Sequence, residues 1–167
     1  MKSIAIVILN WNGLNYLQQF LPSVMANSKV EGFIVDVIVA DNGSTDGSVQ
    51  WLSSLGEGVK IIQLDKNYGF TGGYNRALKQ INSDYYVILN SDVEVNSYWL
   101  EPMVSFIEQN PNVAACMPKI NSYASPTFFE YAGASGGYID YLGYPFCRGR
   151  VLNIVEEDNG QYNEAKE

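Results

Sequence analysis

The stretch VDVIVADNGSTDGS, residues 35–48, decides the fold. Its first half is rich in β-branched apolar residues, which is typical of a buried strand. The pair Asn42-Gly43 is a strong turn signal, and Ser44, Thr45 or Asp46 can cap a helix that follows the turn. A strand, a tight turn and a helix in this order indicate an α/β unit.

The same alternation continues on both sides of this stretch. We expect strands at residues 4–9, 34–40, 59–64, 85–89 and 113–117, and helices at residues 14–24, 48–55, 72–81 and 99–110. Continuous apolar strands that alternate with amphipathic helices indicate a mostly parallel sheet with helices on both faces. The predicted class is therefore a doubly wound, Rossmann-like α/β fold.

The chain is long enough to bury one substantial core, since 47% of its 167 residues are hydrophobic. We expect residues 1–118 to form the α/β region. Residues 119–150, rich in Tyr and Gly, are expected to form hairpins and loops of the same domain. Residues 151–167 have few apolar anchors and are expected to form a polar, frayed tail.

Composition excludes several classes of function. The 10 Lys and Arg residues against 18 Asp and Glu residues give a net charge of −8, which disfavours a nucleic-acid partner. Histidine is absent and the two cysteines, Cys116 and Cys147, lie far apart, which disfavours zinc binding. The apolar run at residues 4–9 is too short for a signal peptide or a membrane span. We expect a cytoplasmic protein, with the inner face of the membrane as an alternative location.

Two carboxylates follow expected strands: Asp41 after the second and Asp92, in Asn90-Ser91-Asp92, after the fourth. Open α/β sheets bind ligands at the carboxyl ends of their strands, so we expect both side chains to project from neighbouring strand ends into one cleft. Asp41 is suited to accept a hydrogen bond from a nucleobase N–H. Asp92 is suited to bind magnesium or manganese, which often take only one or two protein carboxylates. The alternative is that both belong to turns that bind nothing.

A glycine-rich segment, residues 67–75, joins the third strand to its helix. Glycines allow close approach of a ligand to the backbone, and a helix N-terminus favours negative charge. The segment matches neither the dinucleotide-binding motif nor the P-loop. Asn75 is expected either to bind a ligand or only to satisfy the turn.

Five motifs, in order and spacing, resemble family 2 glycosyltransferases, particularly the rhamnosyltransferase-like branch; they lie at residues 8–13, 39–48, 67–70, 72–75 and 89–92. The resemblance implies a GT-A fold that binds a nucleoside-diphosphate sugar and transfers the sugar, with inversion, to a saccharide or lipid-linked acceptor. It also implies a divalent metal, Mn or Mg, bound by Asp92. The donor would be bound by seven further residues, namely Asn10, Asn12, Asp41, Asn67, Gly72, Asn75 and Ser91.

The chain departs from the family pattern in three places. Asn90 replaces the first Asp of the D-x-D motif, and Tyr74 stands where many relatives carry Arg. Arg76 is expected either to have an ordinary surface role, the favoured alternative, or to compensate for that Arg. The chain also ends before any segment that resembles the acceptor-binding part with its acidic base, so the catalytic residue stays open. We therefore expect a truncated donor-binding portion that is inactive alone and self-associates through exposed surface.

Two other functions are compatible with the sequence. A sugar nucleotidyltransferase uses a related sheet and a metal, but Asn10-Trp11-Asn12-Gly13 lacks the basic residues of the loop that such enzymes carry after the first strand. A non-catalytic interaction module that retains the fold is the other alternative.

Overall fold

The computed structural model describes residues 1–130 and 135–162. The chain divides into two compact units, an N-terminal unit of residues 1–104 and a C-terminal unit of residues 105–167. The boundary falls inside helix α4 (Leu100–Gln109). We describe each unit by itself.

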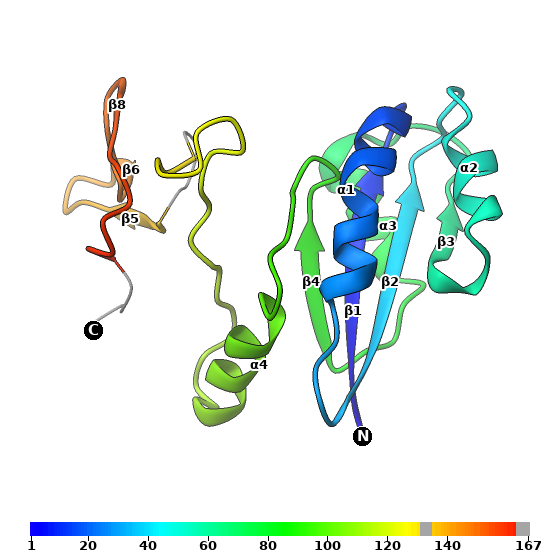
Figure 1. The fold of residues 1–167 in the computed structure, drawn as a ribbon, viewed down its shortest axis with the longest axis horizontal. Coiled ribbons are helices and arrows are strands. Elements are labelled where there is room, and N and C mark those ends of the chain that lie inside the picture. Colours follow the sequence, from blue (N-terminus) through cyan, green and yellow to red (C-terminus); the bar gives the residue numbers. More distant parts are fainter. Residues whose placement is uncertain (131–134, 163–167) are drawn as a thin grey trace. The chain divides into compact units, whose positions relative to one another are not determined.

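The N-terminal unit is built on a four-stranded parallel sheet with the order β3-β2-β1-β4. The strands are β1 (Lys2–Asn10), β2 (Phe33–Asp41), β3 (Lys60–Gln63) and β4 (Tyr85–Leu89). Strands β1, β2 and β4 end at the same edge, the upper one in Figure 1. The register pairs Asn10 with Asp41, the last residues of β1 and β2.

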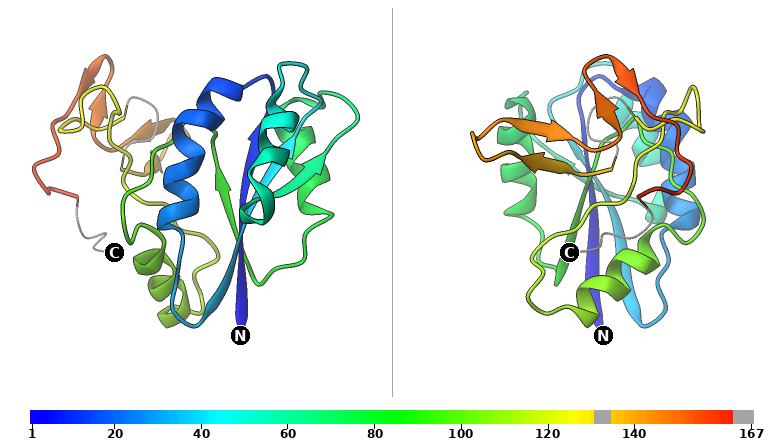
Figure 2. Two further views of the ribbon diagram at one scale, coloured as in Figure 1. Left: turned by 45° about the vertical axis from the view of Figure 1, so that its right-hand side comes forward. Right: turned by 90° about the vertical axis from the view of Figure 1, so that its left-hand side faces the viewer.

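Helices cover both faces of this sheet, as the sequence predicts. Helices α1 (Leu14–Asn27) and α2 (Ser48–Ser54) and the first turns of α4 pack with the side chains of Ile4, Ile6 and Ile8. Helix α3 (Gly69–Leu78) covers the other face, where Ala5 and Val7 lie. The right-hand view of Figure 2 shows the sheet between α3 and α1. A short 3₁₀ helix, η1 (Gly56–Gly58), leads into β3.

Two predicted elements differ in the structure. Residues 113–117 form no strand, and four of these five residues are exposed. A short apolar run has no strand structure of its own without a ladder partner, so the prediction from composition was wrong there. The helix expected at residues 72–81 instead begins at Gly69 and ends at Leu78, because the segment read as a loop forms the first helical turn.

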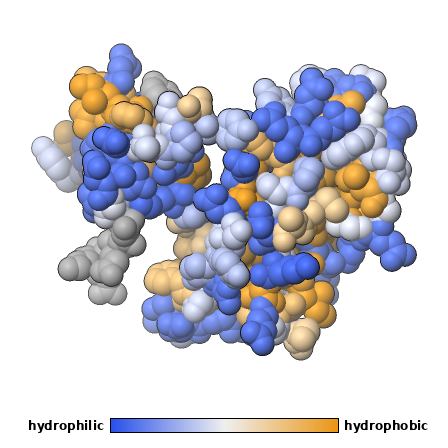
Figure 3. All heavy atoms as spheres, viewed as in Figure 1, coloured by the Kyte–Doolittle hydropathy of each residue, from blue (hydrophilic) through white to orange (hydrophobic). Residues whose placement is uncertain are grey.

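The C-terminal unit contains the hairpins expected after Pro118. Strands β5 (Gly137–Ile139) and β6 (Pro145–Cys147) form one antiparallel pair, and β7 (Arg150–Val151) and β8 (Ile154–Val155) form another. The expected polar tail therefore contains β8, and its last residues, 163–167, lie outside the described part. Hydrophobic surface gathers over these hairpins, at the upper left of Figure 3.

Candidate functional site

The predicted site residues lie at the carboxyl edge of the sheet. Asp41 ends β2, and Asp92 follows β4 in an exposed turn. Strand β1 lies between β2 and β4, so these two carboxylates follow strands that flank β1, not neighbouring strands as expected. Two strand spacings correspond to about 10 Å. A site that contains both Asp41 and Asp92 therefore also contains the end of β1, where Asn10 lies.

Asn10 and Asp41 are both buried, with 1% and 2% of their surface exposed. Asn10 Nδ2 donates to Asp41 Oδ1 at 3.0 Å and to Ser44 Oγ at 3.1 Å, and the backbone N–H of Ser44 donates to Asp41 Oδ2 at 2.9 Å. These bonds compensate the burial of the carboxylate. Asp41 is thus tied to the protein through both oxygens, although each oxygen has a second lone pair for a further donor.

Asn12 joins the loop after β1 to the loop after β2. Its backbone is left-handed, with φ 51°. Its N–H donates to Ser44 Oγ at 2.9 Å, and its Oδ1 accepts from the N–H of Thr45 at 2.7 Å. Asn12 therefore holds the two loops in place, while its side chain remains exposed.

Asp46 fixes the beginnings of two helices. Its Oδ2 accepts from the N–H of Leu14 at 2.9 Å, and its Oδ1 accepts from the N–H of Ser48 at 3.1 Å. Burial raises the pKa of Asp46, but the hydrogen bonds from Ser48 and Leu14 outweigh this effect and leave the pKa below its usual value. The carboxylate is therefore charged beside helix N-termini, where negative charge is favourable.

Asn67 and Asn42 link the start of α3 to the turn after β2. Asn67 Oδ1 accepts from Asn42 Nδ2 at 2.9 Å and from the N–H of Gly69 at 2.7 Å. A Cβ at Gly43 would lie 2.6 Å from Lys66 Cα, so this close approach of two loops requires glycine. The first turn of α3 is fixed in this way to the end of β2.

The other predicted residues of this segment, Gly72 and Asn75, lie on α3 and not in the connection that precedes it. Gly72 packs against Tyr68, because a Cβ at Gly72 would lie 3.1 Å from Tyr68 Cβ. Asn75 is exposed. Arg76 bends back along the helix, with Cζ 3.5 Å from the centre of the Tyr68 ring. Its guanidinium therefore lies against that ring.

The turn after β4 carries Ser91, which is half-buried, and Asp92, which is exposed. Within residues 1–130 and 135–162, we find no hydrogen bond or ion pair of the Asp92 carboxylate. No group of three or more His, Cys, Asp or Glu side chains in that part of the chain is arranged to hold a metal. A single exposed carboxylate fits a hard cation that takes its remaining ligands from phosphate oxygens and water.

Sequence reasoning missed the parts that Gly13 and Ser44 play in this arrangement. A Cβ at Gly13 would lie 2.6 Å from Asn10 Oδ1 and 3.9 Å from Ser91 Oγ, so glycine allows the ends of β1 and β4 to approach. Ser44 accepts from both Asn10 and Asn12, whereas the sequence suggested only a helix cap. Asn10 Oδ1 is buried and has no hydrogen-bond partner among the described residues.

Tyr74, which departs from the family pattern, has a structural role. It is 5% exposed. Its hydroxyl donates to the carbonyl of Leu89 at 2.9 Å and accepts from the N–H of Leu9 at 3.4 Å. Burial raises the pKa of Tyr74. The residue joins α3 to the ends of β1 and β4, beneath the predicted site.

Known proteins resemble this chain over most of its length. It is 24% identical over 136 residues to the teichoic acid poly(glycerol phosphate) polymerase of Staphylococcus epidermidis, which covers 78% of this chain and 18% of the relative. It is 24% identical to the N-acetylglucosaminyl-diphospho-decaprenol L-rhamnosyltransferase of Mycobacterium tuberculosis, over 69% of this chain and 40% of the relative. The chain thus spans well under half of these curated relatives.

Solved structures agree with the fold. The structure of Staphylococcus aureus TarS residues 1–349 in complex with UDP-GlcNAc matches with a TM-score of 0.58 and 26% identity, over 66% of this chain and 32% of that one. The mannosyltransferase PcManGT from Pyrobaculum calidifontis, in complex with GDP-Man and Mn²⁺, matches with a TM-score of 0.54 and 16% identity, over 71% of this chain and 33% of that one. The second likeness shows the fold alone.

The described helices include none that is both long and apolar enough to cross a bilayer.

The family model of Glycosyl transferase family 2 matches residues 4–156, which is nearly the whole chain. With the four-stranded parallel sheet, its helices on both faces and the polar residues at its carboxyl edge, this match shows that the chain belongs to glycosyl transferase family 2.

Proposed function

We propose that this chain binds a nucleoside-diphosphate sugar at the carboxyl ends of β1, β2 and β4. The whole protein then transfers the sugar, with inversion and with the help of Mn or Mg, to a saccharide or lipid-linked acceptor. The UDP-GlcNAc complex of TarS supports the donor class, since TarS is 26% identical and shares the fold. The predicted cytoplasmic location and low activity of this chain alone stay predictions.

One observation carries the proposal: three buried or half-buried polar side chains converge where β1 and β2 end. Asn10, Asp41 and Ser44 are joined by hydrogen bonds of 2.9 to 3.1 Å. Because Asp41 only accepts, it turns the amide NH₂ of Asn10 toward itself and leaves Asn10 Oδ1 buried, with no partner in the described part of the chain. A buried unpaired acceptor is costly in free energy, and such costs are typical of functional sites.

The metal would be held by Asp92. Its carboxylate is exposed and follows a strand that flanks β1. A divalent cation neutralises a leaving diphosphate. The chain carries a net charge of −8, so a diphosphate has to be compensated locally. Asp92 supplies one hard oxygen ligand to the metal. The other residues predicted to bind the nucleotide sugar orient its nucleoside.

The test is isothermal titration calorimetry of the full chain with UDP, dTDP and GDP, each with and without MnCl₂. We expect binding of at least one nucleotide that tightens when manganese is present. Asp92→Asn should remove this dependence on manganese, because an amide oxygen carries no net charge. Glu94→Gln is the matched control, since Glu94 is an exposed carboxylate two residues further along the same connection between β4 and α4.

Two outcomes would contradict the proposal. One is the absence of binding of any of the three nucleotides by a chain whose folding is confirmed by NMR. The other is equal loss of the manganese effect in Asp92→Asn and Glu94→Gln, which would show that overall charge, not a ligand at Asp92, causes it.

A further inference from the structure

The C-terminal unit contains an open surface pocket of about 280 Å³, whose lining includes none of the site residues described above. It is lined by Ser122, Ser125, Phe128, Phe129, Glu130 and Val155. None of these residues takes part in the network around Asn10 and Asp41. The pocket therefore calls for its own explanation.

The backbone that forms this pocket is tied together from three segments. The N–H of Ser122 donates to the carbonyl of Phe128 at 2.9 Å, the N–H of Glu130 to that of Ile120 at 2.8 Å, and the N–H of Phe129 to that of Glu156 at 3.1 Å. The first two hydrogen bonds close the loop between Ile120 and Glu130, and the third joins this loop to a segment distant in sequence. The lining is thus preformed by the fold, as binding pockets usually are.

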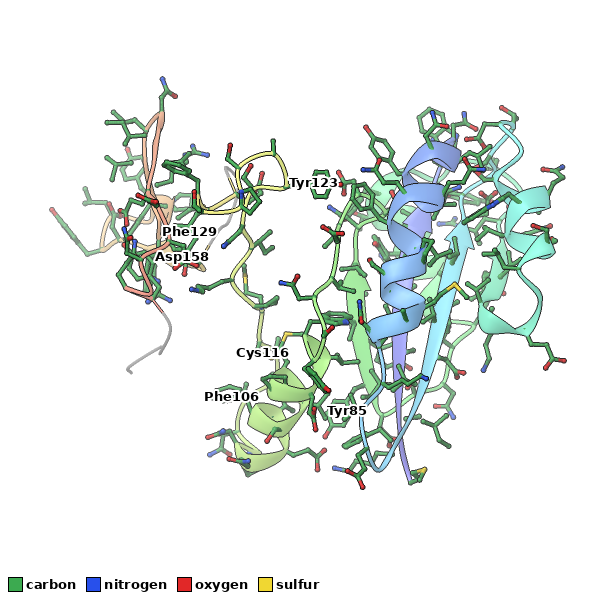
Figure 4. The ribbon with its side chains drawn as sticks, in the orientation of Figure 1. Tyr85, Phe106, Cys116, Tyr123, Phe129 and Asp158 are labelled. Atoms are coloured by element: carbon green, nitrogen blue, oxygen red, sulfur yellow. The ribbon has the colours of Figure 1, made fainter. Side chains whose placement is uncertain are left out.

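Phe129 and an ion pair support the pocket. Phe129 is 1% exposed, and a Cβ at Gly149 would lie 2.7 Å from its ring. Lys119 Nζ lies 5.8 Å from the centre of the Phe129 ring and 2.7 Å from Asp158 Oδ2. Figure 4 labels Phe129 and Asp158, the two side chains that Lys119 contacts. The charge of Lys119 is compensated by Asp158, so it does not make the pocket cationic.

The lining combines an apolar surface with groups that bind hydroxyls. Phe128 is 41% exposed and offers part of its ring to a ligand. Ser122 and Ser125 can both donate and accept, and the carboxylate of Glu130 accepts. A pyranose has the complementary chemistry, because its C–H groups pack on an aromatic ring while its hydroxyls donate and accept at the edge.

Size and charge narrow the class of ligand. A volume of about 280 Å³ lies just below the range of ligand pockets, which run from about 300 to 1,000 Å³, and suits one sugar ring better than a nucleotide. Glu130 lies in the lining, and Glu156 and Glu157 lie on the segment paired with Phe128 and Phe129. These three carboxylates outnumber Arg150, which is paired with Val155, so the local charge disfavours phosphate and other anions. A neutral, polyhydroxylated ring fits both the volume of the pocket and the negative charge around it.

We propose that this pocket binds one neutral pyranose unit of a saccharide. That this pyranose belongs to the acceptor rests on the proposed glycosyl transfer. The binding of a pyranose in the pocket does not depend on that proposal. Phe128 packs on the C–H face of the ring, and Glu130, Ser122 and Ser125 bind its hydroxyls.

The experiment is saturation-transfer NMR on the full chain with three probes: methyl β-D-glucopyranoside, methyl α-L-rhamnopyranoside and methyl N-acetyl-β-D-glucosaminide. We expect transfer to the ring protons of at least one probe. Phe128→Ala and Glu130→Gln should each weaken binding about fivefold to tenfold, corresponding to the loss of one aromatic contact or one charged acceptor. The matched control is Tyr141→Ala, which removes an aromatic residue that is 94% exposed and lies outside the pocket lining.

The proposal is overturned if no probe receives saturation from the folded wild-type chain, or if Tyr141→Ala weakens binding as much as Phe128→Ala does. The nucleotide titrations are read separately. Glycoside binding without nucleotide binding would support the pyranose pocket and contradict the proposed nucleotide-sugar site. Nucleotide binding without glycoside binding would support the nucleotide-sugar site and contradict the pyranose pocket.

Discussion

The two units of this chain bury hydrophobic side chains to very different extents. In the N-terminal unit, five consecutive residues of β1, from Ile4 to Ile8, are at most 2% exposed. In the described part of the C-terminal unit, Phe129 is the only buried hydrophobic residue. The hairpin residues there are mostly exposed, among them Ile139, Tyr141, Leu142 and Leu152.

This difference follows from architecture. A parallel sheet with helices on both faces removes both faces of its central strands from water. A pair of two-residue or three-residue strands has no second layer, and isolated hairpins of this kind are marginally stable. The N-terminal unit is therefore expected to be stable through its core. In its described part, the C-terminal unit has one buried aromatic side chain, Phe129, together with an ion pair, ring contacts such as Tyr138–Phe146, and local hydrogen bonds.

The largest expected effect is that of Phe129→Ala. Removal of a buried Phe side chain costs about 3–5 kcal/mol, which should be enough to unfold the C-terminal unit alone. Amide hydrogen exchange should show protection lost at residues 119–130 and kept in β1. Phe128→Ala, which changes an exposed neighbour, should leave both regions protected. Loss of protection in β1 as well would contradict the difference in stability between the units, since it would show that both units unfold together.

A smaller effect is expected in the N-terminal unit for Tyr74→Phe. The substitution keeps the ring but removes the hydroxyl that donates to the carbonyl of Leu89 at 2.9 Å. A buried acceptor left unpaired costs about 1–3 kcal/mol. Urea unfolding followed by the signals of β1 should show this loss, while Tyr16→Phe, at a site 54% exposed, should show almost none. Equal effects of the two substitutions would contradict the structural role of Tyr74.

The stabilities of the two units should also differ in their dependence on pH. A hydrogen bond from Lys119, followed by one from the N–H of Gly160, lowers the pKa of Asp158. Because the folded-state pKa lies below the unfolded value of about 3.9, this carboxylate stabilises its unit above that pH. The stabilisation is lost as the pH falls through the folded-state pKa.

Asp158→Asn should therefore reduce the pH dependence of stability in the C-terminal unit and leave that of the N-terminal unit, which includes Asp46, unchanged. Urea unfolding at pH 7 and pH 3, followed by NMR signals from each unit, measures this difference. An unchanged pH dependence of the C-terminal signals would show that the ion pair contributes nothing.

The smallest expected effect is weak self-association through exposed hydrophobic surface of the C-terminal unit. Tyr141 is 94% exposed and Ile139 is 74% exposed, and contiguous apolar surface of this kind favours association. Light scattering over a concentration series should show a rising mean mass for the wild type and a smaller rise for Tyr141→Ser. A constant monomer mass at high concentration would remove this prediction.

The sequence predicted the strands and helices of the N-terminal unit because their signals are local. Continuous apolar runs are buried on both faces of a parallel sheet, and the side chains at helical spacing, such as Leu17, Leu21 and Val24, all lie in the core. The run at residues 113–117 gave the same local signal but forms no strand. Composition alone does not contain the partner that a strand needs.

The α/β class, the polar residues that follow the strands and the family resemblance could all be predicted from the amino-acid sequence, since each depends on local runs of residues. The order β3-β2-β1-β4 could not, nor could the position of β1 between the strands that Asp41 and Asp92 follow. The tertiary structure also shows that Asp41 is tied to Asn10 and Ser44 and that Tyr74 holds α3 beneath the site. The physical reason is that strand order, burial and hydrogen-bond partners arise from contacts between distant segments, which periodicity and spacing do not encode.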